Sequence, residues 1–199
     1  MGRRILYPAL LLALFLLAGC GQQGEQAPEQ YIEPAQLTAE EEKIAKLLGY
    51  EGDARIFDFF LDDSVQSMKE HLYELVDGQW KELTGGSYAV ESGAGRIALE
   101  FERLDGPTRI AFQQGEGYSA VSHDRGTAPD GLGVGTSCLS QREEISCGAE
   151  IPLVVQVMTS KSEMSLYGVE GFQEPERYAE QGHEHVYAFT VSFHQEALD

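Results

Sequence analysis

The chain has 199 residues, of which 33 are acidic and 14 are basic, so its formal net charge at pH 7 is −19. A surface of this charge repels nucleic acid and anionic lipid headgroups, and we therefore expect neither to be a partner. The length suits a single domain with a hydrophobic core of its own.

The first 20 residues carry the most specific pattern in the chain. Arg3 and Arg4 precede an apolar run over residues 5–17. This run is too short for a membrane-spanning helix, which needs about 20 residues, but it suits the apolar part of a signal peptide. It ends in the sequence LAGC, whose cysteine is Cys20. Small residues just before a cysteine suit a cleavage site.

This N-terminal pattern resembles the lipobox of bacterial lipoprotein signal peptides. The resemblance covers residues 1–20 and implies that residues 1–19 are a signal peptide and that Cys20 carries acyl chains after cleavage. Two or more chains anchor a protein stably, whereas a single chain does so marginally. We therefore expect a protein of the cell membrane or outer membrane that is lipid-anchored and faces outside the cytoplasm. The alternative is an ordinary secretory signal with a chance cysteine.

Cleavage would divide the chain into a tether and one domain. It would remove two of the 14 basic residues and none of the 33 acidic ones, so the mature chain would have a net charge of −21. Residues 20–37 are polar, contain prolines and have few apolar side chains, which predicts a lipidated flexible tether. Residues 38–199 then form a single acidic β-rich domain.

A short helix is expected at the start of that domain. Thr38 and Glu41 have the spacing of a capping box. Apolar residues follow at helical spacing, and a glycine ends the pattern: Ile44, Leu47, Leu48 and then Gly49. We expect this apolar stripe to pack on a sheet.

The rest of the domain is predicted to consist mainly of strands, because its apolar residues recur at every second position. The expected strands span residues 56–61, 66–76, 79–83, 96–104, 108–113, 118–123, 151–159 and 185–194. Asp77-Gly78 predicts a two-residue hairpin turn. Residues 124–149 read as a long irregular segment. The pattern predicts a mainly β fold: an antiparallel β-sandwich or partly open barrel of about eight strands with one short N-terminal helix.

The chain has three cysteines. Lipidation of Cys20 would leave two of them, Cys138 and Cys147, available to pair. An extracytoplasmic compartment lacks the thiol buffer of the cytosol, so we expect these two to form a disulfide. It would close a loop of about ten residues and stabilise the fold by about 2–3 kcal/mol. The alternative is a pair of buried free thiols. A metal site built on cysteines is disfavoured by the absence of a CxxC spacing.

His183 and His185 are the best metal candidates. Residues two apart on a strand share a face, so both imidazoles can reach one ion. A third ligand would have to come from elsewhere, such as His71, His123 or an acidic residue. The alternative reading is a polar loop that enters a strand.

Ser122, His123 and Asp124 are the residue types of a hydrolase triad, but adjacent residues of a strand point to opposite faces. The sequence therefore predicts no catalytic residue and no cofactor.

These observations favour a binding or adaptor module for an envelope component, a glycan, a peptide or a protein. One alternative is a structural or assembly factor of the cell envelope that docks through a sheet edge. A second alternative is a metal-binding protein or metalloenzyme that uses His183 and His185. A cleft beside residues 124–149 would favour the first interpretation, and an exposed strand edge would favour the assembly factor.

Overall fold

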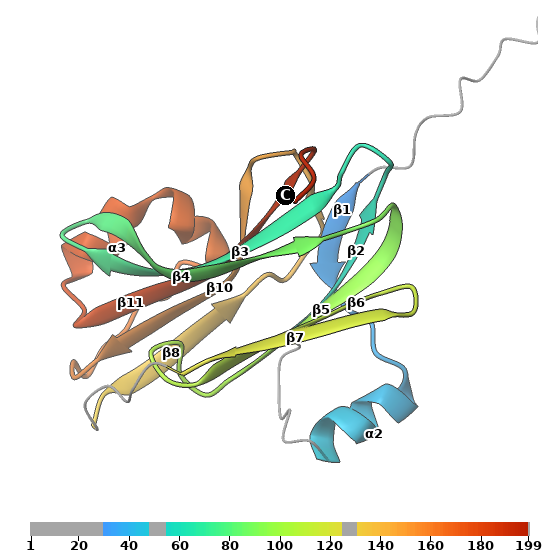
Figure 1. Cartoon of the computed structure of the whole chain (residues 1–199). Coiled ribbons are helices and arrows are strands. Elements are labelled where there is room, and N and C mark those ends of the chain that lie inside the picture. The colour runs from blue at the N-terminus through green and yellow to red at the C-terminus, as the bar shows by residue number, and fades with distance from the viewer. Residues whose placement is uncertain (1–29, 48–54, 125–130, 199) are drawn as a thin grey trace, which may run out of the picture.

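The computed structural model describes residues 30–47, 55–124 and 131–198 (Figure 1). The predicted signal peptide, the lipidation site Cys20 and the tether up to residue 29 lie outside these ranges. Within them, no helix is both long enough and apolar enough to cross a membrane.

Two antiparallel sheets form the domain, which is sandwich-like and not closed into a barrel, so the predicted mainly β fold is confirmed. In spatial order the six-stranded sheet contains β7 (Gly117–His123), β6 (Thr108–Gln114), β5 (Gly93–Phe101), β2 (Ile56–Leu61), β1 (Tyr31–Pro34) and β9 (Glu143–Glu144). The five-stranded sheet contains β4 (Gln79–Ala89), β3 (Ser67–Val76), β11 (His185–His194), β10 (Glu150–Thr159) and β8 (Gly133–Cys138).

The core lies between the two sheets, where alternate side chains of each strand meet. Phe59 of β2 joins the layers, because its ring stacks on Phe112 of β6 and also contacts Phe193 of β11, each at a centroid distance of 5.7 Å. Gly95 gives this ring its space, since a Cβ at that position would lie 2.1 Å from the ring. The core therefore depends on large aromatic side chains set against small residues.

Helix α2 (Ala39–Leu47) begins with the predicted capping box. The N–H of Thr38 donates to Glu41 Oε2 at 2.7 Å, and the N–H of Glu41 donates to Thr38 Oγ1 at 3.3 Å. Arg96 of β5 also donates to Glu41, at 2.7 Å. The Thr38 N–H and the Arg96 guanidinium together lower the pKa of Glu41 to about 2. These contacts hold the helix by its polar side.

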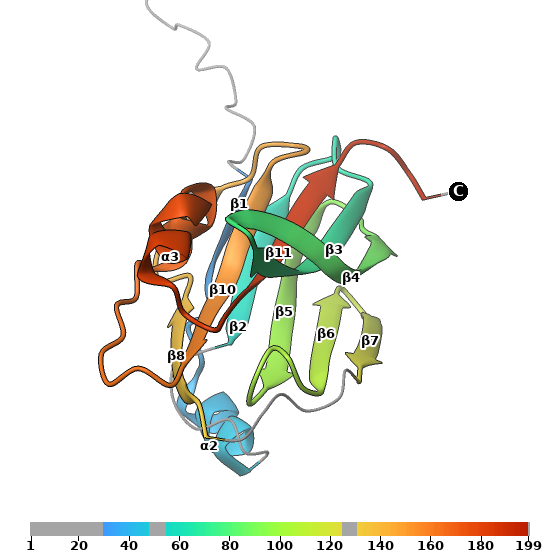
Figure 2. The same cartoon turned by 90° about the vertical axis from the view of Figure 1, so that its left-hand side faces the viewer.

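The expectation that the stripe of α2 packs on a sheet is wrong for the residues described. Ile44 is 59% exposed and Leu47 is 86% exposed. The inner faces of both sheets already cover each other, and α2 lies beyond the end of the sandwich (Figures 1 and 2). From this position the stripe does not reach a sheet face, and Leu48 lies outside the described residues.

Residues 31–34 correct the predicted tether, because they form β1 between β2 and β9. Ile32 is fully buried in the core. The Arg142 guanidinium stacks over the Tyr31 ring at 3.7 Å and donates to Glu33 at 2.8 Å. A four-residue strand with one buried apolar side chain shows no periodicity, so the sequence gives it no signal.

The predicted irregular segment also contains two strands, β8 and β9. β8 pairs with β10 at the margin of the five-stranded sheet, and its glycines weaken its strand pattern. The outer face of this sheet carries the 3₁₀ helix η1 (Val169–Gln173) and helix α3 (Pro175–Gln181), which begins at the expected proline. Trp80 of β4 donates to the Phe172 carbonyl at 2.8 Å and thereby binds η1 to the sheet.

The predicted disulfide between Cys138 and Cys147 is absent from the structure. Cys138 lies opposite Val154, which itself lies opposite Phe189 of β11. Cys147 is placed by its neighbour Gly148, whose N–H donates to the Phe193 carbonyl at 2.8 Å. Phe189 and Phe193 are about 13 Å apart along β11, whereas bridged cysteines need Cα atoms within about 7 Å.

Two isoleucines test the burial of the N-terminal elements. We expect Ile32→Ala to lower the free energy of unfolding by about 2–5 kcal/mol, because it leaves a cavity in the core. Ile44→Ala should change it by less than about 0.5 kcal/mol, since that side chain is mostly exposed. Urea denaturation of the purified protein measures both values. Similar losses for the two variants would contradict the placement of β1 and α2.

Candidate functional site

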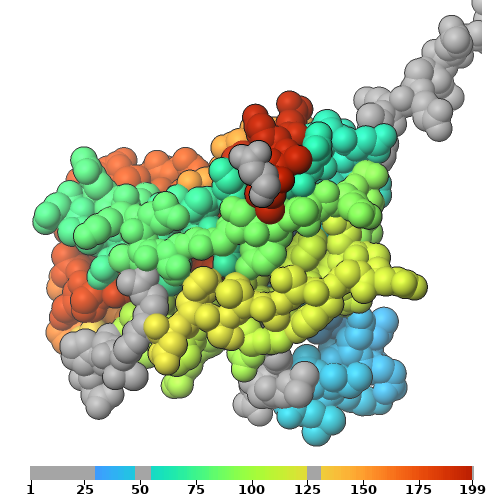
Figure 3. All heavy atoms as spheres, in the orientation of Figure 1, coloured from blue at the N-terminus to red at the C-terminus, as the bar shows by residue number. Residues whose placement is uncertain are grey.

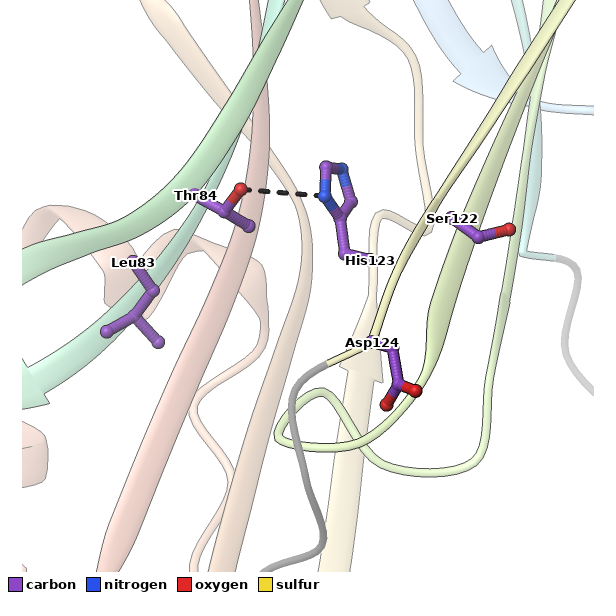
Figure 4. A pocket seen from close by; sticks show the side chains of 5 residues that line it. All are labelled: Leu83, Thr84, Ser122, His123 and Asp124. Atoms are coloured by element: carbon purple, nitrogen blue, oxygen red, sulfur yellow. Dashed lines mark hydrogen bonds between the residues drawn. The ribbon is translucent and has the colours of Figure 1, made fainter.

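A cavity of about 600 Å³ opens between β4 and β7, which are terminal strands of the two different sheets. Its lining consists of Leu83, Thr84, Ser122, His123 and Asp124 (Figure 4). The cavity lies at the start of the 124–149 segment, beside which a cleft would favour a binding module.

The β4 wall of the cavity is shaped by a turn and a bulge. Asp77 and Gly78 have φ values of 50° and 76°, which form the predicted two-residue hairpin turn, of type I′, between β3 and β4. Further along, Leu72 pairs with Thr84 and the next residue of β3 pairs with Glu82, so Leu83 has no opposite residue. Such a bulge bends the strand locally and redirects its side chains.

The β7 wall follows from a second tight hairpin. Gly115, with φ of 55°, opens the two-residue turn from β6 into β7. Because β6 buries Ile110 and Phe112 toward the other sheet, the residues opposite them on β7 face the same way. His123, at the end of β7, lies opposite the buried Thr108 and shares this inner face.

Glu70 lies behind His123 on the inner face of β3 and is only 1% exposed. Its Oε1 accepts a hydrogen bond from the Tyr88 hydroxyl at 3.1 Å and lies 3.1 Å from Nε2 of His123. The other carboxylate oxygen, Oε2, is buried without a hydrogen-bond partner among the described residues. Gly86 provides the room, because a Cβ there would lie 2.7 Å from Oε1. The Glu70–His123 bond therefore connects the two sheets.

The hydrogen bonds define a relay from the cavity to the buried carboxylate. An ionised carboxylate only accepts, so Nε2 of His123 carries the proton in this bond. In a neutral ring Nδ1 is then the acceptor, and Thr84 Oγ1 lies 3.5 Å from it, as Figure 4 shows. Burial, and secondarily the charge of Glu70, raises the pKa of Tyr88, which keeps its hydroxyl a donor.

The relay gives the cavity an excess of acceptors. Thr84 and His123 meet at the outer limit of a hydrogen bond, so neither group is saturated. Asp124 adds a carboxylate to the lining. Chemically, this arrangement suits a ligand group that brings several N–H donors.

A similar trio lies further along the same face of β3. Glu74 Oε1 lies 3.1 Å from His185 Nδ1 and accepts from the Tyr187 hydroxyl at 3.1 Å. Its carboxylate is more exposed than that of Glu70. The two trios share residue types and differ in burial, which makes Glu74 a natural control for Glu70.

The structure places the two predicted metal candidates in separate contacts. His185 bonds to Glu74, whereas Nε2 of His183 bonds to the Gln181 side chain before β11 begins. Burial and the nearby Lys161 lower the pKa of His183. Across residues 30–47, 55–124 and 131–198, no group of three or more His, Cys, Asp or Glu residues is arranged to hold a metal ion. The third ligand that this hypothesis needs is not found there.

Ser122, His123 and Asp124 all line the cavity, yet they do not form a triad. Their side chains diverge, and the hydroxyl of Ser122 points away from the imidazole (Figure 4). The sequence missed the actual partners of His123, which are Glu70 and Thr84. The sequence did contain one signal for Glu70. This residue lies between Met68 and Leu72 in the alternating pattern of β3, at a position whose neighbours on the same face are buried and apolar.

Comparison with known proteins gives no relative: no family model, no curated protein and no solved structure matches this chain. The functional argument therefore depends on the geometry of the cavity and on the N-terminal sequence pattern.

Tyr88 reports directly on the buried carboxylate. We expect Glu70→Gln to move the pKa of Tyr88 downward, because it removes the negative charge while burial continues to oppose ionisation. Titration of ¹³C-labelled tyrosine by NMR measures this shift, with Tyr88→Phe assigning the resonance. Glu74→Gln should leave the pKa of Tyr88 unchanged. An equal response to both variants would contradict the contact.

Proposed function

We propose that this chain is a lipid-anchored binding protein on the outer side of a membrane, and that its cavity takes a protonated amine or guanidinium group of the ligand. The observation that carries the proposal is the relay from Thr84 through His123 to the buried Glu70. It fixes a set of acceptors at the wall of a cavity large enough for a side chain or a small molecule.

Hydrogen-bond geometry supports a donor-rich ligand. The 3.5 Å contact between Thr84 and His123 is weak enough for an incoming N–H group to replace it with two shorter bonds. An ammonium group has three donors and a guanidinium group has five, whereas a carboxylate or phosphate has none to offer. The cavity therefore selects by donor number as well as by charge.

The charges around the cavity favour a cationic ligand. Glu70 is held in the interior, where an interaction between charges is less screened than in water. The carboxylate of Asp124 lines the cavity itself, and the chain as a whole is strongly acidic. A positively charged ligand is attracted over a long range by such a field, and an anionic one is repelled.

The anchor supports an extracytoplasmic location. If Cys20 is lipidated, ten residues separate it from Tyr31, and a flexible chain of that length spans on the order of 17 Å. β1 leads from that end of the sandwich to α2 at the other end (Figure 1). A tether of this length lets the cavity face outward and reach a ligand in solution or on a neighbouring protein.

Small neutral analogues test the cavity. We expect N-acetyl-lysine methylamide to shift the NMR signals of His123 and Thr84, and N-acetyl-norleucine methylamide, which lacks the ammonium group, to leave them unchanged. Glu70→Gln should weaken binding of the lysine probe by about tenfold, or about 1.4 kcal/mol, because it removes the buried negative charge behind His123. Thr84→Val removes one acceptor at constant shape and should also weaken it.

Glu74→Gln is the matched control and should bind the probe like the unchanged protein. Equal binding of the lysine and norleucine probes, or normal binding by both Glu70→Gln and Thr84→Val, would reject a cation site in this cavity.

Mass spectrometry tests the anchor. We expect protein purified from membranes to begin at Cys20 and to carry acyl chains there, and Cys20→Ala to release the chain from the membrane fraction. Recovery of an unmodified Cys20, or of a cytosolic protein that retains residues 1–19, would refute this part of the proposal.

A further inference from the structure

β7 is an unprotected sheet edge. It pairs with β6 in an unbroken register and has no partner on its other side within the described chain. Its sequence, GYSAVSH, contains no proline, no lysine and no acidic residue. Natural proteins use such residues, bulges or covering segments to keep edges from pairing with other strands. Within residues 30–47, 55–124 and 131–198, β7 has none of these protections.

Two of the other three terminal strands are protected. β4 carries Lys81 and Glu82 together with the bulge at Leu83. β9 is only two residues long. Met164 and Leu166 lie over one face of β8, since their side chains are within 3.0 Å of where a Cβ of Gly135 would be. β7 therefore differs from β4 and β9 in its open edge, and from β8 in its place beside the cavity.

The main chain of β7 is available for pairing. Because Gly117 and Gln114 close a two-residue hairpin, the alternation of antiparallel pairs directs the N–H and C=O groups of Tyr118, Ala120 and Ser122 away from β6. All three residues are exposed, with Tyr118 at 65%. In Figure 3 the yellow atoms of this hairpin run across the front of the molecule beside the green atoms of β4.

The inner side of this edge leads to the cavity. Side chains of a strand added to β7 would alternate between the outer face and the inner face that Val121 and His123 share. Glu116 and Asp124 lie at the two ends of β7, and Glu70 lies behind His123. The outer face instead carries Arg109, which donates to the Tyr118 hydroxyl. A basic side chain therefore fits the inner face.

We infer that β7 binds an extended peptide segment of another protein by strand addition, with a lysine or arginine of that segment in the cavity beside His123. This inference rests on the proposed function and names its ligand as a peptide. Main-chain hydrogen bonds to Tyr118, Ala120 and Ser122 supply the affinity, and the cavity supplies the selection for a basic residue.

A seven-residue peptide matched to the length of β7 tests the inference: acetyl-Lys-Thr-Val-Thr-Val-Thr-Lys-amide. Its pattern is symmetric, so either strand direction places a lysine at the His123 end and on the inner face. We expect it to bind the full protein and to slow amide hydrogen exchange at Tyr118, Ala120 and Ser122. Copies with glutamate in place of lysine, or with methylated backbone nitrogens, should bind at least tenfold more weakly.

Ala120→Pro removes an N–H that β6 does not use and blocks an added strand, and edge strands tolerate proline at such positions. We expect it to weaken peptide binding at least tenfold, whereas the matched variant Ala120→Ser keeps the affinity. Binding of the single lysine probe should be unchanged in both variants. An unchanged peptide affinity in Ala120→Pro would overturn strand addition and leave the cavity site standing.

The remaining outcomes separate the two proposals. If Ala120→Pro abolishes peptide binding while Glu70→Gln has no effect on peptide or lysine probe, the cation site fails and the selection for a basic residue fails with it. If the protein forms a dimer in sedimentation experiments that Ala120→Pro dissociates, and the peptide does not compete, then a second copy of the chain occupies β7 and the inference is wrong.

Discussion

The hydrogen bond between Glu70 and His123 is the contact on which the architecture of the site depends. It joins β3 of one sheet to β7 of the other at the side where the sandwich is open. A carboxylate in the interior is costly without donors, and Tyr88 and His123 both supply donors to Oε1, whereas Oε2 has no partner among the described residues. The bond to Glu70 occupies Nε2 of His123, so Nδ1 is the nitrogen that faces Thr84 and the cavity.

The open side of the sandwich and the cavity are consequences of one arrangement. β4 and β7 end their sheets next to each other, and neither sheet closes on the other. At β4 and β9 the margins are finished by charged residues with a bulge and by a short strand, which prevent unwanted pairing. In the binding mode that we propose, the neutral and exposed β7 supplies a main-chain docking surface, and the adjacent cavity with surplus acceptors supplies the selection.

In the N-terminal elements, the local sequence signal and the burial of the side chains do not go together. The capping box of α2 forms as its spacing predicts, because it needs only contacts within four residues. Whether the apolar stripe is buried depends on its reaching a sheet face, and from beyond the end of the sandwich it does not reach one. β1 shows the opposite behaviour, because its sequence gives almost no local signal for a strand. Tertiary contacts hold it in place: Ile32 is buried in the core, and Arg142, just before β9, donates to Glu33.

The sequence by itself determined the mainly β class, the two-residue hairpin turn at Asp77-Gly78 and most of the long strands, because these depend on side-chain alternation and on backbone preferences of single residues. Only the tertiary structure decided that Glu70 meets His123, that Cys138 and Cys147 lie apart, and that β7 ends its sheet. Those facts follow from which strands become neighbours, and pairing across long stretches of chain leaves no periodic trace in the sequence.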